Sequence, residues 1–124
     1  MNAKCFFDTN VIVYANDSSN LTKQRIAREI IKQALLEDTA VISVQVLNEF
    51  WVTVTQKISV PLASDQAQKE IELLSLMDVV DLSFDLFKDG ITIQSAHQLS
   101  FWDALIIAAA RAEIARLEGI FSLY

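Results

Sequence analysis

The sequence alternates short apolar, β-rich runs with longer stretches of helical apolar spacing, and this alternation limits the folds open to the chain. Short runs at residues 4–8, 39–44 and 79–82 are each followed by a helical pattern, with no series of hairpin turn signals. Two glycines and one proline in 124 residues favour a helix-rich globule over a loop-rich or disordered chain. The pattern predicts an α/β fold in which a central parallel sheet is flanked by helices, with right-handed crossovers.

Helical spacing predicts helices at residues 10–15, 21–36, after residue 44, 66–77, 84–96 and 100–116, and a last strand at 119–124. The helix at 66–77 is expected to be capped by Ser64 and Asp65. In the second of these helices, six apolar residues are expected to face the sheet: Ile26, Ala27, Ile30, Ile31, Ala34 and Leu35. The helix after residue 44 carries its apolar stripe at Val46, Phe50 and Val54. Trp51 and Trp102 stand at apolar helical spacing too, so both are expected in the core.

Composition excludes several classes of protein. Length indicates a single domain over residues 1–124, and no apolar run approaches the roughly 18 residues that span a bilayer. Asp8 leaves too short an apolar region at the start of the sequence for a signal peptide, so we expect a cytoplasmic protein. Cys5 is the only cysteine, which rules out an intrachain disulfide and a cysteine-based zinc site, and we expect it in a buried strand. A net charge of −6 means that RNA, if bound, must meet local basic patches or metal ions.

Three acids stand where separate β-α units would bring them to one edge of the sheet. Asp8 ends the first strand, Glu49 lies in the helix after the second, and Asp103 lies in the first turn of the helix from Ser100. Ligands of open parallel sheets bind outside the carboxyl ends of the strands. Carboxylates suit Mg²⁺ and Mn²⁺, so the trio indicates metal-assisted hydrolysis of phosphodiesters.

Each acid also has an ordinary structural interpretation. Asp8 can cap the helix that follows it, and Asp103 with Ser100 forms a pattern close to a capping box. Glu49 lies at the border of its helix's apolar stripe and can be a solvated surface residue. His97, the only histidine, is expected to be structural or on the surface. The helix from Ser100 is apolar nearly all round except at Asp103, which predicts a buried helix whose carboxylate needs a partner.

Three blocks of sequence together resemble PIN domains of the VapC toxin group. They are FFDTNV at residues 6–11, SVQVLNEF at residues 43–50 and FWDALIIAAA at residues 101–110. Their order and separation match the family, and the likeness runs from residue 4 to about residue 124. The resemblance implies a PIN-like three-layer α/β fold and Mg²⁺- or Mn²⁺-dependent cleavage of RNA.

Carried over residue by residue, the resemblance makes Asp8, Glu49 and Asp103 the metal-binding and catalytic acids. Thr9, Asn10 and Ser43 match polar family positions and are expected to support the acids or to contact substrate. The resemblance also implies a homodimer and a cognate antitoxin that blocks the site, which makes the chain the toxin of a type II toxin-antitoxin system. One departure is that the family's C-terminal segment, with its fourth carboxylate and a further strand, does not follow residue 124. That departure predicts weak activity.

Two other functions compete with the ribonuclease. A truncated or degenerate PIN domain would bind a partner or RNA without cutting it, and metal binding would distinguish the two. A small signalling domain of the response-regulator kind would place a phosphorylatable Asp at a strand end. The absence of paired acids just before the first strand and of a well-placed late lysine counts against that second alternative.

Overall fold

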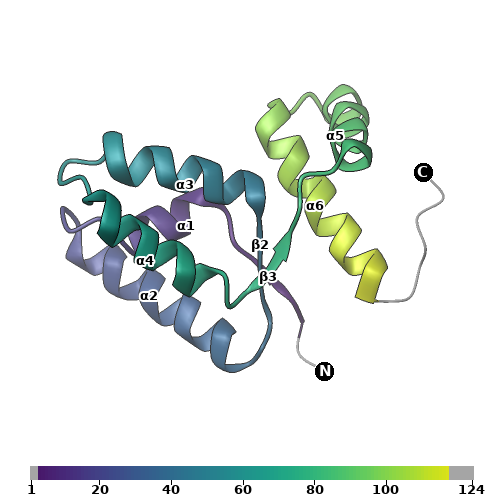
Figure 1. Cartoon of the computed structure of the whole chain (residues 1–124). Helices are drawn as coiled ribbons and strands as arrows, with labels where there is room; N and C mark the ends of the chain where they lie inside the picture. Colours follow the sequence, from purple (N-terminus) through teal and green to yellow (C-terminus); the bar gives the residue numbers. More distant parts are fainter. Residues whose placement is uncertain (1–2, 118–124) are drawn as a thin grey trace. The chain divides into compact units, whose positions relative to one another are not determined.

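The structure, a computed structural model, describes residues 3–117, so the strand expected at 119–124 lies outside the described residues. Its elements in chain order are β1 (Cys5–Phe6), α1 (Thr9–Tyr14), α2 (Leu21–Leu36), β2 (Ala40–Ser43), α3 (Val44–Gln56), α4 (Ser64–Leu74), β3 (Asp78–Val80), α5 (Phe84–His97) and α6 (Phe101–Leu117). Figure 1 shows their course. Each helix and each of the three strands described was expected from the sequence, with boundaries shifted by a few residues.

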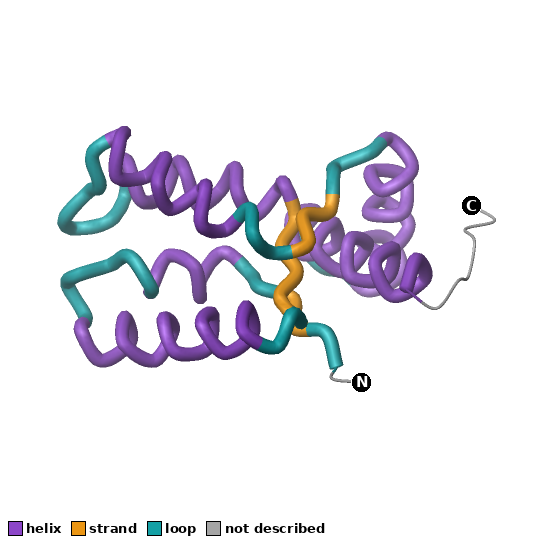
Figure 2. Tube along the Cα trace, turned by 60° about the horizontal axis from the view of Figure 1, so that its bottom comes forward, coloured by secondary structure: helices purple, strands orange, loops and turns teal. Residues whose placement is uncertain are grey.

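The three strands form one sheet in the order β1-β2-β3, drawn in orange in Figure 2. β1 pairs in parallel with β2, so that Cys5 lies opposite Ala40 and Phe6 opposite Val41. All four residues of β2 are buried, as expected of a central strand covered on both faces. The α/β fold class is therefore confirmed. Cys5 lies in a strand as expected but is only half-buried, and this burial raises the pKa of its thiol.

The described residues group into two compact units, each with its own contacts. The first contains the chain up to Ile42 and Val46–Val79, and the second contains Ser43–Gln45 and the chain from Val80 onward. In the first unit, the stripe of Val46, Phe50 and Val54 on α3 is fully buried, which confirms the periodicity of that helix. Helices α1 to α4 lie beside the strands in both views (Figures 1 and 2).

Helix α2 begins and ends where the sequence predicts, but its buried face is narrower than expected. Ala27, Ile31 and Ala34 are buried, whereas Ile26 and Ile30 are exposed. At about 100° per residue, the buried three span a single side of the helix and the two isoleucines lie beyond its edge. The expectation that both isoleucines face the sheet was wrong.

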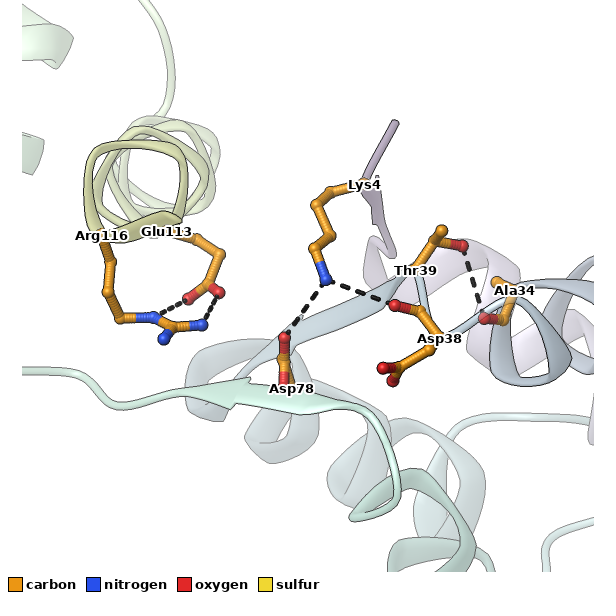
Figure 3. Close-up of polar contacts among 7 residues, drawn as sticks. All are labelled: Lys4, Ala34, Asp38, Thr39, Asp78, Glu113 and Arg116. Atoms are coloured by element: carbon orange, nitrogen blue, oxygen red, sulfur yellow. Dashed lines mark hydrogen bonds and ion pairs between the residues drawn. The ribbon is translucent and has the colours of Figure 1, made fainter. Parts of the chain in front are cut away.

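Lys4 joins three segments of the first unit at the start of the strands (Figure 3). Its Nζ donates to the backbone oxygen of Asp38, at 3.3 Å, and lies 3.7 Å from Oδ2 of Asp78, the first residue of β3. Asp38 has a positive φ of 56°, in the left-handed region that turns the chain from α2 toward β2. The turn is completed by Thr39, whose Oγ1 donates to the carbonyl of Ala34.

Helix α4 is shorter than predicted. It ends at Leu74, before the expected Met77, and it already includes Ser64 and Asp65, so the expectation that these two residues cap it was wrong. The cap residue is Ala63, whose N–H donates to the side-chain oxygen of Gln66. Leu74 and Met77 are buried, whereas Leu76 is exposed.

The second unit is built on the packing of α5 against α6. Its buried cluster consists of Leu86, Ile93, Ala104, Leu105, Ala108 and Ala109, with Val80, Leu99 and Phe101 packed against it. Gly90 sits at the closest approach, since a Cβ there would stand 2.7 Å from Cδ2 of Leu105. Close packing of the two helices therefore explains why a glycine stands in the middle of α5.

Helix α6 is less buried than its composition predicts. Trp102, Ile107 and Ile114 are exposed, and so is Asp103. The expectation of a fully buried helix was wrong, as was the placement of Trp102 in the core, while Trp51 on α3 is half-buried. No helix among the described residues is long and apolar enough to cross a membrane.

Candidate functional site

Asp8 follows β1 and caps α1. Its backbone is extended, and its Oδ1 accepts a hydrogen bond from the N–H of Val11 at 3.2 Å. The structural interpretation of this residue is thus confirmed. The side chain is exposed, and its second oxygen accepts no hydrogen bond from the described part of the chain. A carboxylate capping through one oxygen keeps lone pairs on the other for a further ligand.

Glu49 lies in the second turn of α3, at the border of the buried stripe, and is half-buried as expected. Its Oε2 accepts a hydrogen bond of 2.5 Å from Oγ1 of Thr9, the first residue of α1. This bond joins the residue next to Asp8 to Glu49 across 40 positions of sequence. Within the first unit, the Thr9–Glu49 hydrogen bond therefore connects the segment of Asp8 with the helix of Glu49.

Asp103 belongs to the second unit and stands in the first turn of α6. Its N–H donates to Oγ of Ser100 at 3.1 Å, so Ser100 is the cap and that half of the predicted capping pattern is confirmed. The carboxylate of Asp103 is exposed. The same turn is held from another segment, because Nε2 of the buried Gln45 donates to the carbonyl of Trp102 at 2.9 Å.

The other predicted residues are placed as follows. Asn10 is exposed on α1, Ser43 is buried at the end of β2, and His97 is exposed at the end of α5. Among residues 3–117, no three His, Cys, Asp or Glu side chains form a group arranged to hold a metal ion. Within the first unit, Asp8 and Glu49 offer carboxylate oxygens, which are the donors that hard divalent ions prefer, and Thr9 fixes one oxygen of Glu49.

A pocket of about 640 Å³ opens in the first unit between α1, α2 and α4. Most of its walls are apolar, and the charged groups at it are Arg28, Lys32 and Glu70. Arg28 is anchored there, since its Nε donates to the carbonyl of Ala15 at the end of α1 at 2.8 Å. The lining residues are Ile12, Ala15, Asn16, Arg28, Ile31, Lys32, Leu35, Leu36, Glu70, Leu73 and Leu74. We call this pocket the α1-α2-α4 groove.

Sequence reasoning did not find the groove, although α2 carries a signal for it. Arg28, Ile31, Lys32 and Leu35 repeat at i, i+3, i+4 and i+7, which places cations and apolar side chains on one face. The apolar residues of this helix were expected to face the sheet, so no groove was expected beside it.

Comparison with known proteins gives one family. A family model described as PIN domain matches residues 5–117, which is most of the chain and includes every predicted site residue. No curated protein matches the chain.

Proposed function

Because this chain belongs to the PIN-domain family, a nuclease-type fold, we propose that it is a metal-dependent endoribonuclease that hydrolyses RNA phosphodiester bonds. We assign its metal-binding and catalytic acids to Asp8, Glu49 and Asp103. The observation that carries the proposal is the Thr9–Glu49 hydrogen bond, which holds a carboxylate from α3 against the segment that follows β1. Strand ends of parallel sheets are where ligands bind, and both Asp8 and Glu49 follow such ends.

Each residue has a separate task in this proposal. A bound Mg²⁺ or Mn²⁺ would neutralise charge on the phosphate and lower the pKa of a water molecule. Asp8 offers the carboxylate oxygen that does not cap α1. Asp103 offers an exposed carboxylate in the first turn of α6, which Ser100 caps. Thr9 orients Glu49 through its hydroxyl, while Asn10 and Ser43 stand near the same strand ends as supporting or substrate-contacting groups.

The test combines metal binding with RNA cleavage. We expect the purified chain to bind Mn²⁺ in a calorimetric titration and to cut a labelled single-stranded RNA with Mn²⁺ but not with EDTA. Asp103→Asn should remove most metal binding and cleavage while leaving the melting temperature nearly unchanged, because the carboxylate is exposed. Asp85→Asn is the matched control, since Asp85 is also an acid in a first helical turn.

Equal Mn²⁺ affinity of the Asp103→Asn variant and the unaltered chain would contradict the site assignment. Metal binding without any cleavage would instead favour the alternative function, a PIN fold that binds RNA or a partner without cutting it.

We also propose that the chain is the toxin of a type II toxin-antitoxin system whose antitoxin blocks the acidic site, and that a further segment of the same antitoxin binds in the α1-α2-α4 groove. The groove supports this because its apolar walls suit an amphipathic segment, and Arg28 and Lys32 suit acidic side chains on it. The product of a neighbouring short reading frame should then co-purify with the chain. Lys32→Glu should weaken that complex and Lys57→Glu should not, since Lys57 does not line the groove. Equal binding by both variants would contradict the placement.

Self-association is proposed from the surface of α5. Phe84, Phe87 and Ile91 recur at i, i+3 and i+7 and are all exposed, which gives this helix an apolar stripe toward solvent. We expect a homodimer by light scattering at micromolar concentration, and Ile91→Glu should shift it toward the monomer. A monomer at every accessible concentration would overturn this part of the proposal.

A further inference from the structure

Trp102 is the most solvent-exposed tryptophan of the chain, at 56% of its surface, although its helix is otherwise rich in apolar residues. Its neighbours along α6, Ala104 and Leu105, are buried in the α5-α6 cluster. An indole side chain offers a large apolar surface together with one N–H donor, and burying it would be favourable. The structure leaves this surface unused within the described chain.

The backbone that carries Trp102 is held firmly. Its carbonyl accepts the hydrogen bond from the buried Gln45, and the next N–H, of Asp103, donates to Ser100. Ser100 also accepts through its carbonyl from the N–H of Ala104 at 3.0 Å. Hydrogen bonds therefore fix the turn on both sides of the indole. An aromatic side chain on a fixed backbone loses little conformational freedom when it binds, which favours its use as a contact.

The sequence around this turn favours one kind of contact with RNA. No lysine or arginine occurs between Asp89 and Ala110, so the start of α6 offers no cation of its own to a phosphate. Stacking of a base on an aromatic ring requires no cation, since every base has a π face. A chain of net charge −6 is not attracted to RNA by its overall charge, so stacking contributes a larger share of the binding free energy than it would in a basic protein.

We propose that Trp102 is a substrate-contacting residue that stacks on an unpaired base of single-stranded RNA, beside the phosphate that Asp103 serves. This inference rests on the proposed ribonuclease function. The contact requires an unpaired base, because bases inside a duplex cannot reach the indole.

The experiment uses the full chain with Trp51→Phe, which leaves Trp102 as the only tryptophan. Titration with a short unstructured RNA in EDTA should quench its fluorescence, and the same RNA annealed to its complement should not. In the cleavage assay with Mn²⁺, Trp102→Ala should raise KM roughly 5- to 150-fold with little effect on kcat. Trp102→Phe should restore most of that loss, since it keeps an aromatic face.

Three results would overturn the inference. RNA that binds without quenching, with Trp102→Ala cutting as well as the unaltered chain, would remove Trp102 from the substrate while leaving the ribonuclease intact. Failure of the unaltered chain to bind or cut RNA would overturn the proposed function and this inference together. A fluorescence change that follows protein concentration without RNA would assign Trp102 to a contact between copies of the chain.

Discussion

Helices α3 and α6 each carry a predicted metal-binding acid and a tryptophan, yet they use their apolar residues differently. On α3 the apolar stripe is fully buried and Glu49 at its border is held by Thr9. On α6 the apolar residues surround the helix, and several of them are exposed together with Asp103. Periodicity identifies the buried face when apolar residues occupy one side. When they occupy all sides, the sequence alone does not distinguish core from binding surface.

The largest expected difference between the two helices is in stability. Phe50→Ala on α3 removes a fully buried side chain and should lower the free energy of unfolding by about 3 to 5 kcal/mol, because a cavity remains. Ile114→Ala on α6 is the control and should change it by less than about 0.5 kcal/mol, since Ile114 is exposed. Urea denaturation measures both. Comparable losses in the two variants would show that α6 is as buried as α3.

The next effect concerns how the acids are supported. Thr9→Val removes the hydroxyl that donates to Glu49 with little change of shape, and should weaken Mn²⁺ binding about tenfold. Thr9→Ser keeps a hydroxyl and should bind Mn²⁺ nearly as the unaltered chain does. Calorimetric titration of the two variants decides. If Val and Ser behave alike, Glu49 is no better supported than Asp103.

A smaller effect is expected where α5 meets α6. Gly90→Ala would place its Cβ against Leu105, and the repacking should cost about 1 to 3 kcal/mol, reduced by the roughly 1 kcal/mol that alanine gains in a helix. We therefore expect a net loss near 1 kcal/mol in thermal unfolding. Thr92→Ala, at an exposed position of α5, should not destabilise. A stabilised Gly90→Ala variant would mean that the two helices are not closely packed.

The smallest effect is a gain. Gln98 ends α5 in the left-handed conformation, with φ 53° and ψ 38°, where glycine has no steric penalty. Gln98→Gly should raise the free energy of unfolding by about 0.5 to 1 kcal/mol. Gln94→Gly, inside the same helix, should lower it by about as much. A loss in both variants would indicate that Gln98 contributes contacts that outweigh its backbone strain.

Much of the fold could be predicted, because each element depends on local periodicity. The bounds of α2 and the buried stripe of α3 were predicted correctly. The errors lie where tertiary contacts decide. Ile26 and Ile30 of α2 and Trp102 of α6 were expected to be buried from their spacing, but all three are exposed. Of the site, the Asp8 and Ser100 caps were predictable from sequence, while the Thr9–Glu49 bond depends on two segments meeting in space.

The parallel pairing of β1 with β2 also sets a sequence of events during synthesis of the chain. Because α1 and α2 lie between the two strands, Cys5 and Phe6 have no sheet partner until Ala40 and Val41 have been translated. At about 5 to 20 residues per second, the delay is on the order of seconds. Local helices form much sooner than such distant pairs. The residues of β1 therefore spend that interval without β2, so this pair of strands forms only after the helices between them.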